Sequence, residues 1–120
     1  MAASVLVLED SLIIALETED ILRANGVGSI DIVNTHDQAM DAIRQKKYDF
    51  ALLDVNLGEA MSFDFARHLA EQQVPFGFVS GYSDTQDFPE DLQNVPLLVK
   101  PFDEDTMQSF LAKLSVNRDL

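Results

Sequence analysis

The chain contains no cysteine, and only 8 of its 120 residues are lysine or arginine. The absence of cysteine excludes a disulfide scaffold and any metal site built from thiolates. Because 21 residues are acidic, the formal net charge is −13. This charge argues against binding to nucleic acid or to an anionic membrane surface, since phosphate contacts need clustered lysine and arginine. The cluster Arg44, Lys46 and Lys47 is too small to reverse the overall field.

Long hydrophobic runs are also absent. The longest runs are about five residues, whereas roughly 20 are needed to span a bilayer. The N-terminus, MAASVLVLED, lacks the basic start and long apolar stretch of a signal peptide. We therefore expect a cytoplasmic protein with no membrane insertion. The length fits a single domain over residues 1–120, and the hydrophobic fraction of 47% is ordinary for a globular protein.

Short apolar runs alternate with longer amphipathic ones along the chain. The short runs predict strands at residues 4–8, 29–33, 50–53, 76–79 and 97–99. Between them we expect helices over residues 12–25, from Thr35 through Ile43, over 62–73, and after Asp103. Ser11, Thr35 and Asp103 are the expected N-caps, and Gly26 is the expected stop of the first helix. The polar segment 84–95 contains Pro89 and predicts only a short or distorted helix.

Apolar residues recur at helical spacing along these helices, and in the third and last helices we expect them to face inward. For the first helix the apolar positions are Ile13, Leu16, Ile21 and Leu22, and for the second they are Ala39, Met40, Ala42 and Ile43. The third helix offers Phe63, Phe65, Ala66 and Leu69, and the last offers Met107, Phe110, Leu111 and Leu114. Five strand–helix units with apolar strands predict an α/β fold, a doubly wound five-stranded parallel sheet.

Polar residues stand at the ends of four of these strands: Glu9-Asp10, Asp54, Ser80-Gly81 and Lys100-Pro101. In a doubly wound sheet the carboxyl ends of the strands meet at one edge, where ligands bind. Three carboxylates brought together there would raise one another's pKa, and Lys100 offsets one of them. Oxygen ligands without histidine or cysteine favour Mg²⁺ or Mn²⁺ over zinc.

An aspartate beside such a cation and a lysine suits phosphoryl transfer, which depends on positioning and charge neutralisation. Asp54 would be the oxygen nucleophile, and Lys100 would pair with the transferring group. Ser80 would donate from its hydroxyl, and the Gly81 amide could approach closely because glycine has no Cβ.

The motifs VLVLEDS, LLDVNL, FVSGY and LLVKPF, in this order and spacing, resemble the receiver domain of bacterial two-component response regulators. The resemblance covers essentially the whole chain and implies the flavodoxin-like strand order 2-1-3-4-5. It also implies that Asp54 accepts a phosphoryl group from a histidine of a sensor kinase or phosphotransfer protein, while Lys100 pairs with that group and Ser80 moves to hydrogen-bond it. The protein would then catalyse only its own phosphorylation and dephosphorylation.

The resemblance further implies a Mg²⁺ site, in which Mn²⁺ could substitute. Its ligands would be Glu9, Asp10, Asp54 and the backbone carbonyl of Asn56, with Asp10 bound directly and Glu9 through water. The Lys100-Pro101 peptide bond would be cis, as in the family.

Several residues depart from the family pattern. Glu9 stands where aspartate is commoner, Gly58 where many members have proline, and Leu97 where an aromatic switch residue is usual. The run PFGFVSGY is similar to the FAT GUY subgroup, which also lacks that aromatic, and Tyr82 is a candidate for part of the switch.

The chain ends soon after the last helix, so we expect a stand-alone receiver that signals by docking to a downstream protein. The expected docking face consists of the short fourth helix, the fifth strand and the last helix. It would include Phe88, Pro89, Leu92 and Leu97.

Other interpretations of the acidic residues fit less well. A haloacid-dehalogenase-type phosphatase would need an acid at position 56, which is Asn56, and a flavodoxin would need a neutral loop where Glu9-Asp10 stands. A calcium loop starting at Asp54 fails because its sixth and twelfth positions are Glu59 and Phe65. A non-phosphorylated interaction module that keeps the acidic pocket remains open. His36 and His68 have no expected role beyond the helix surface.

Overall fold

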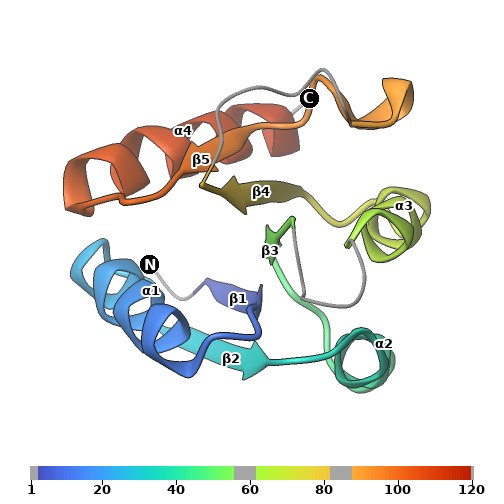
Figure 1. Cartoon of the computed structure of the whole chain (residues 1–120), viewed down its shortest axis with the longest axis horizontal. Coiled ribbons are helices and arrows are strands. Elements are labelled where there is room, and N and C mark those ends of the chain that lie inside the picture. The colour runs from blue at the N-terminus through green and yellow to red at the C-terminus, as the bar shows by residue number, and fades with distance from the viewer. Residues whose placement is uncertain (1–2, 56–61, 82–87, 120) are drawn as a thin grey trace.

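A computed structural model describes residues 3–55, 62–81 and 88–119 of the chain. Five parallel strands form one sheet in the order β2-β1-β3-β4-β5, which confirms the predicted fold class and strand order (Figure 1). The strands are β1 (Ser4–Leu8), β2 (Ser29–Val33), β3 (Phe50–Asp54), β4 (Phe76–Ser80) and β5 (Leu97–Val99). The helices are α1 (Leu12–Ala24), α2 (His36–Gln45), α3 (Phe63–Glu71), the 3-10 turn η1 (Glu90–Leu92) and α4 (Glu104–Asp119).

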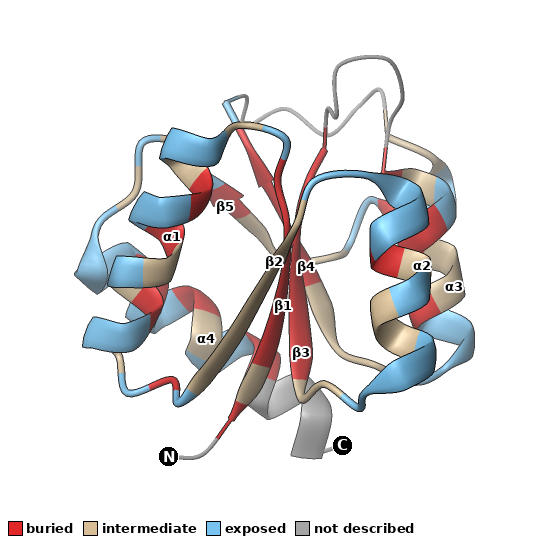
Figure 2. Cartoon of the chain, turned by 90° about the horizontal axis from the view of Figure 1, so that it is seen from below, coloured by how far each residue is buried: buried red, intermediate tan, exposed pale blue. Residues whose placement is uncertain are grey.

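The helices form one layer on each face of the sheet, α1 and α4 on one side and α2 and α3 on the other (Figure 2). Successive residues of β1 alternate between these layers: Val5 and Val7 pack toward Leu22 and Phe110, whereas Leu6 and Leu8 pack toward Phe65. Because both faces are covered, the central strands are apolar along their length and buried. This burial fixes where the central strands end, and so where the polar residues after them lie.

The predicted caps form at the starts of three helices. Ser11 Oγ accepts a hydrogen bond from the Ile14 N–H at 3.4 Å, and Thr35 Oγ1 accepts from the Gln38 N–H at 3.1 Å. Asp103 and Thr106 exchange two hydrogen bonds of 2.9 Å across the first turn of α4. Gly26 follows α1 with φ +90°, a conformation that favours glycine, and so ends the helix as expected.

The apolar spacing of α1 did not show which of its residues are buried, whereas the short helix predicted before β5 is confirmed. The side chains of Ile13 and Leu16 face solvent, because the buried stripe of α1 consists of Ala15, Thr18 and Leu22. The segment before β5 forms only η1, in keeping with Pro89 just ahead of it, and residues 84–87 lie outside the described residues.

Gly77 has a packing role that the sequence did not indicate. A Cβ at this position would collide with the ring of Phe110, so the absence of a side chain lets α4 lay that ring directly on β4. Phe110 is 3% exposed and belongs to the same core cluster as Met107 and Leu114. The inward positions predicted for α4 are thereby confirmed.

Candidate functional site

The acidic residues predicted to converge lie together at the carboxyl edge of the sheet. Glu9, Asp10 and Asp54 each offer one carboxylate oxygen, and these oxygens lie within 4.8 Å of one another. The geometry follows from strand pairing: Leu8 lies beside Leu53 in adjacent parallel strands, so the residues that come next, Glu9 and Asp54, are also neighbours. The central sheet therefore brings these three carboxylates together, although 44 positions separate Asp10 from Asp54 in the sequence.

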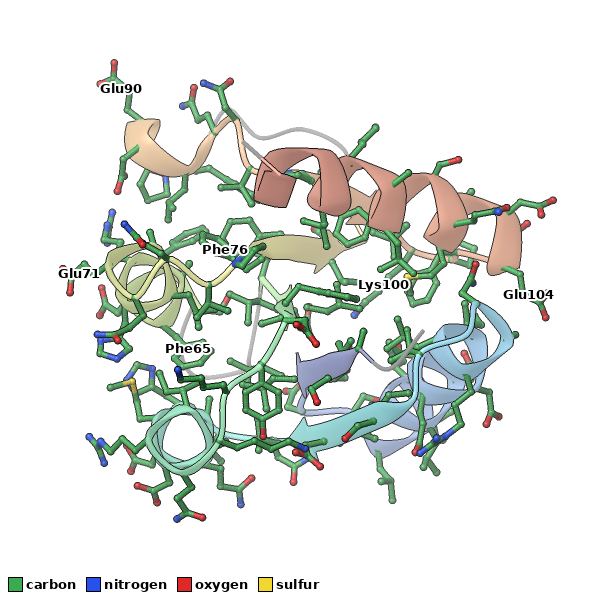
Figure 3. The ribbon with its side chains drawn as sticks, turned by 180° about the vertical axis from the view of Figure 1, so that it is seen from behind. Phe65, Glu71, Phe76, Glu90, Lys100 and Glu104 are labelled. Carbon is green, nitrogen blue, oxygen red and sulfur yellow. The ribbon has the colours of Figure 1, made fainter. Side chains whose placement is uncertain are left out.

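Lys100, labelled in Figure 3, comes directly after β5, and its side chain reaches this cluster. Its Nζ lies 3.1 Å from Glu9 Oε1 and 3.4 Å from Asp54 Oδ1. Its backbone N–H donates to the Ser80 carbonyl at 2.7 Å, which continues the β4–β5 pairing to the base of the side chain. The Lys100-Pro101 bond is cis, as the resemblance implied.

Two of the three acids are buried, and the cluster carries more negative than positive charge. Glu9 is 3% exposed and Asp54 8%, whereas Asp10 is exposed. Burial, followed by the hydrogen bond with Asp54, raises the pKa of the Glu9 carboxyl above its ordinary value, although the Ser11 N–H and Lys100 act in the opposite direction. Three carboxylates facing one ammonium group, with oxygen as the donor atom throughout, fit a hard divalent cation such as Mg²⁺.

Ser80 and Gly81 stand next to the cluster at the end of β4. Asp54 pairs with Val79 across β3 and β4, which places Ser80 one residue beyond the nucleophile candidate. Ser80 is 6% exposed, and a Cβ on Gly81 would contact nothing within 4 Å. Among the described residues, the space where a side chain of residue 81 would start is thus open. Asn56, Gly58 and Tyr82 lie outside the described residues.

Two contacts of the site were not predicted. The Ser11 N–H donates to Glu9 Oε2 at 3.2 Å, so the residue that caps α1 also holds the acid. Asn34, after β2, donates from Nδ2 to the Glu9 carbonyl oxygen at 3.2 Å. An asparagine after the second strand carries no sequence signal for this role, because the contact depends on the packing of β2 beside β1.

Only part of the expected docking face is exposed to solvent. Leu97 is partly buried beside Phe78, its register partner. The ring centroid of Phe88 lies 5.2 Å from that of Phe63 and 5.5 Å from that of Phe78. Leu92 is 3% exposed, so its place in the docking face is wrong: the single turn of η1 directs it into the core rather than toward a partner.

Exposed apolar side chains gather instead on α1. Leu12, Ile13 and Leu16 are 64%, 72% and 48% exposed. Beside them, between α1 and the loop after β5, lies a cleft of about 330 Å³ lined by Ile14, Glu17, Ile21, Lys100, Pro101 and Phe102. The same lysine thus belongs to the acidic cluster and to this cleft, so the apolar surface of α1 adjoins the candidate site.

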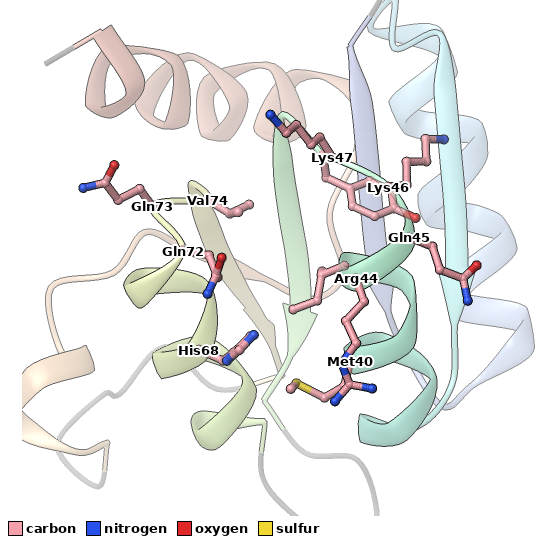
Figure 4. A pocket seen from close by; sticks show the side chains of 11 residues that line it. Met40, Arg44, Gln45, Lys46, Lys47, His68, Gln72, Gln73 and Val74 are labelled. Carbon is pink, nitrogen blue, oxygen red and sulfur yellow. The ribbon is translucent and has the colours of Figure 1, made fainter.

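A larger cleft of about 840 Å³ lies between α2 and α3, far from the acidic cluster (Figure 4). It contains the basic run predicted from the sequence together with His68. Two of its cations are already paired, since Arg44 lies 3.1 Å from Asp41 and Lys46 lies 3.0 Å from Asp31. These cations also stand at the carboxyl end of α2, where positive charge is favourable. Arg44 and Lys46 are therefore accounted for by their ion pairs and by their place at the end of α2.

His36 lies edge-on to the ring of Phe65 at 6.0 Å, in keeping with its expected place on the helix surface. No helix among the described residues is both long enough and apolar enough to cross a membrane.

Comparison with known proteins agrees with this geometry. The family model of the response regulator receiver domain matches residues 5–112. The sensory transduction protein LytT of Bacillus subtilis (strain 168) is 30% identical over 120 residues, which cover 97% of this chain and 50% of LytT, so the chain spans about half the length of that relative.

Two solved structures are also similar. SdrG from Sphingomonas melonis Fr1 is 32% identical with a TM-score of 0.82, over 95% of this chain and 97% of that chain. The receiver domain of the response regulator PhyR from Erythrobacter litoralis is 27% identical with a TM-score of 0.80, over 96% of this chain and 91% of that chain.

Proposed function

The chain belongs to the response regulator receiver domain family of two-component signalling, and from this premise we propose that it accepts a phosphoryl group on the carboxylate of Asp54. The observation that carries the proposal is the meeting of Asp54 with two further acids within 4.8 Å and with the Lys100 amine at 3.4 Å. The donor would be a phosphohistidine on a sensor kinase or phosphotransfer protein.

The transfer needs a carboxylate oxygen on a positioned nucleophile at the edge of the sheet. An oxygen of Asp54 attacks phosphorus, a P–O bond forms as the P–N bond to the donor imidazole breaks, and the imidazole nitrogen keeps the electron pair. The product is an acyl phosphate on Asp54. Lys100, already beside Asp54, would pair with a phosphoryl oxygen, and the Ser80 hydroxyl and Gly81 amide would donate hydrogen bonds to others.

Asp10 and Asp54 are the residues that would hold Mg²⁺ directly, with Glu9 acting through water, since Mg²⁺ is usually bound by one or two carboxylates together with water and phosphate. When bound, the ion supplies positive charge to the phosphoryl oxygens. The carbonyl of Asn56 and the substitution of Mn²⁺ stay predictions. Asp10 suits the metal because it is exposed and, within the described residues, no hydrogen bond or ion pair occupies its carboxylate.

We infer that the phosphohistidine protein docks on α1. Leu12, Ile13 and Leu16 form an exposed apolar surface next to the site, and acidic residues of α1 such as Glu17 and Asp20 surround it. The complementary surface is an apolar face edged with lysine or arginine. A downstream target would then use the neighbouring surface over β5 and α4, where Val99 is 39% exposed.

The competing interpretation, an interaction module without phosphorylation, is not favoured. Buried like charges destabilise a fold. A module without phosphorylation would gain nothing in return for keeping the nucleophile, the other acids and the lysine in contact. The membership of the FAT GUY subgroup, the switch role of Tyr82 and a cytoplasmic location stay predictions.

Labelling by a small phosphodonor tests the proposal. With acetyl phosphate and Mg²⁺, we expect the wild type to gain one phosphoryl group by intact-mass spectrometry, and Asp54→Asn to gain none. Asp31→Asn is the matched control, because Asp31 is a paired carboxylate elsewhere on the sheet. Labelling of Asp54→Asn at the wild-type rate would move the acceptor to another residue.

A further inference from the structure

We propose that Asn34 is a positioning residue, which holds the loop between β1 and α1 so that the Asp10 carboxylate faces the cation site. This loop, residues 9–11, is called the acidic loop below. Asn34 would act through the backbone of the acidic loop and would contact neither the cation nor the phosphoryl group. The inference rests on the proposed function for the use that the chain makes of Asp10, and it extends that function to a residue between β2 and α2.

The Glu9 carbonyl lies where the pairing between β1 and β2 comes to an end. A backbone bond runs from the Glu9 N–H to the Val33 carbonyl at 3.0 Å, and β2 ends at Val33. In a longer parallel pair, the next bond would run from the neighbouring backbone to the Glu9 carbonyl. Here the Asn34 side chain provides that bond, since its Nδ2 donates to the carbonyl at 3.2 Å in a partly buried contact. A side-chain amide thus continues the sheet by one bond at the residue before Asp10.

The hydrogen bond at the Glu9 carbonyl also restrains Asp10. The peptide unit that joins these two residues is planar, so fixing its oxygen fixes the direction in which the Asp10 Cα leaves the strand. Asp10 is exposed, so little packing around its side chain holds it in place. The backbone is therefore what brings a carboxylate oxygen of Asp10 within 4.8 Å of one of Asp54.

Asn34 is itself held by the start of α2. Its backbone N–H donates to Gln38 Oε1 at 2.9 Å, while the Gln38 N–H donates to Thr35 Oγ1 at 3.1 Å. These two bonds fasten the first turn of α2 to the residue that precedes its cap, in the manner of a capping box. On the other side of the acidic loop, Ser11 caps α1 through its Oγ. Asn34 thus connects a fixed helix start to the acidic loop.

This arrangement lowers the free energy that is needed to order the acidic loop when a cation binds. A backbone residue that becomes fixed on binding loses conformational entropy. A loop that is already fixed loses less, so the ion binds more tightly. Partners in the outer shell of a metal site raise affinity in the same manner, because they orient ligands that they do not replace. We therefore expect Asn34 to affect the affinity for Mg²⁺ and to leave the maximal rate of phosphoryl uptake unchanged.

A second asparagine provides a matched control for the test. Asn25 follows the last residue of α1, at the opposite end of that helix from the acidic loop. It also donates from Nδ2 to backbone carbonyls, those of Ile21 at 3.0 Å and Glu104 at 3.3 Å. Asn25→Ala therefore removes the same kind of hydrogen bond as Asn34→Ala, at a distance from the acidic cluster.

Calorimetry of Mg²⁺ binding compares the two variants. We expect Asn34→Ala to raise the dissociation constant about fivefold, because one net hydrogen bond is lost. Asn25→Ala should change it by less than about twofold, since distant sites act independently, although this variant loses two bonds and lowers the melting temperature at least as much. Equal weakening by both variants would indicate a general loss of stability and overturn the proposal, as would an unchanged constant in Asn34→Ala.

A second measurement needs neither metal nor phosphoryl transfer. In metal-free protein, NMR relaxation gives the order parameter of the Asp10 amide, which is about 0.85 in rigid backbone and below about 0.6 in flexible backbone. We expect the Asp10 value to fall towards the flexible range in Asn34→Ala and to stay at the wild-type level in Asn25→Ala. An Asp10 value that does not change in Asn34→Ala would contradict the restraint.

Asn34→Gln is the conservative variant, since it keeps an amide donor on a side chain that is one bond longer. Its affinity for Mg²⁺ should lie between those of the wild type and Asn34→Ala. An affinity no better than that of Asn34→Ala would count against the hydrogen bond as the cause.

The rate of labelling by acetyl phosphate separates metal affinity from the chemical step. Asn34→Ala should need about fivefold more Mg²⁺ for half-maximal labelling, and should reach the wild-type rate once Mg²⁺ saturates. A lower rate at saturating Mg²⁺ would refute the assigned role. A wild type that takes up no phosphoryl group would defeat the proposed function, whereas the metal-free order parameter reports on Asn34 alone.

Discussion

The Glu9 cluster at the carboxyl end of the sheet and the Asp31 cluster on β2 each contain one lysine, yet their charge balance differs. Asp31 accepts from the Tyr48 hydroxyl at 2.7 Å and from Lys46 Nζ at 3.0 Å, so one carboxylate meets one ammonium and one hydroxyl donor. Lys46 also donates to Ser29 Oγ at 3.0 Å. Every charge in this second cluster has a partner.

The Glu9 cluster is short of positive charge and is also more buried. Lys100 and Glu9 side chains are 21% and 4% exposed, against 41% and 45% for Lys46 and Asp31. A balanced and solvated cluster stabilises the fold modestly, whereas an unbalanced buried one destabilises it until a further cation arrives. The comparison teaches that the cluster with unfavourable electrostatics is the one at which we propose phosphoryl transfer.

Metal binding should distinguish the two clusters most strongly. At a Mg²⁺ concentration 100 times its dissociation constant, we expect stabilisation of about 2.7 kcal/mol. For a domain of this size that corresponds to a rise in melting temperature of about 10 °C. Asp10→Asn should abolish the rise and Asp31→Asn should leave it intact. A melting curve that millimolar Mg²⁺ does not move would remove the argument for a cation site.

Removal of the Asp31 carboxylate should have a smaller, purely structural effect. Asp31→Asn loses the charge-assisted bonds to Tyr48 and Lys46, and because both partners are partly exposed we expect destabilisation of about 1 kcal/mol. Chemical denaturation would measure it. Phosphoryl uptake should be unchanged, and a loss of uptake would show that the two clusters are coupled.

The smallest expected effect is an opposite pH dependence of the two clusters in metal-free protein. The pKa of Glu9 is raised in the folded state by burial, so the folded protein holds this proton more tightly than the unfolded chain does. Its contribution to stability is therefore greatest at pH values below the unfolded value of 4.5 and is lost as the pH rises through the raised pKa.

For Asp31 the sign is reversed. The Tyr48 hydroxyl, and after it Lys46, lower the pKa of Asp31, so its contribution is present above the unfolded value of 3.8 and is lost as the pH falls through the lowered pKa. Unfolding free energies of wild type, Glu9→Gln and Asp31→Asn, measured from pH 3 to 7, should give difference curves of opposite slope. Equal slopes would contradict this account.

Much of the site could be predicted from the sequence because strand ends are local features. The end of each apolar run predicts the end of a strand, and the polar residues found there are Glu9, Asp54, Ser80 and Lys100. Parallel pairing then brings these strand ends to one edge of the sheet. The helix N-caps could also be predicted, because each cap side chain bonds to a backbone N–H only three residues away. They are Ser11, Thr35 and Asp103.

The sequence pattern was less informative about which side of an element meets solvent. Apolar spacing on α1 did not reveal that Ile13 and Leu16 are exposed, because helical periodicity shows a stripe without showing what covers it. Leu92 was expected on the surface and lies in the core, since one turn of η1 replaces a full helix.

The order of apolar runs, caps and strand-end polar residues determined the fold class and the membership of the acidic cluster, because these depend on short-range sequence pattern. Tertiary structure alone decided how charge is shared inside that cluster. The contacts of Glu9 with Lys100, across 91 positions, and of Asn34 with the Glu9 carbonyl, across 25, arise from side-chain reach and packing between strands. Such distances are set by the whole core, and no local pattern encodes them.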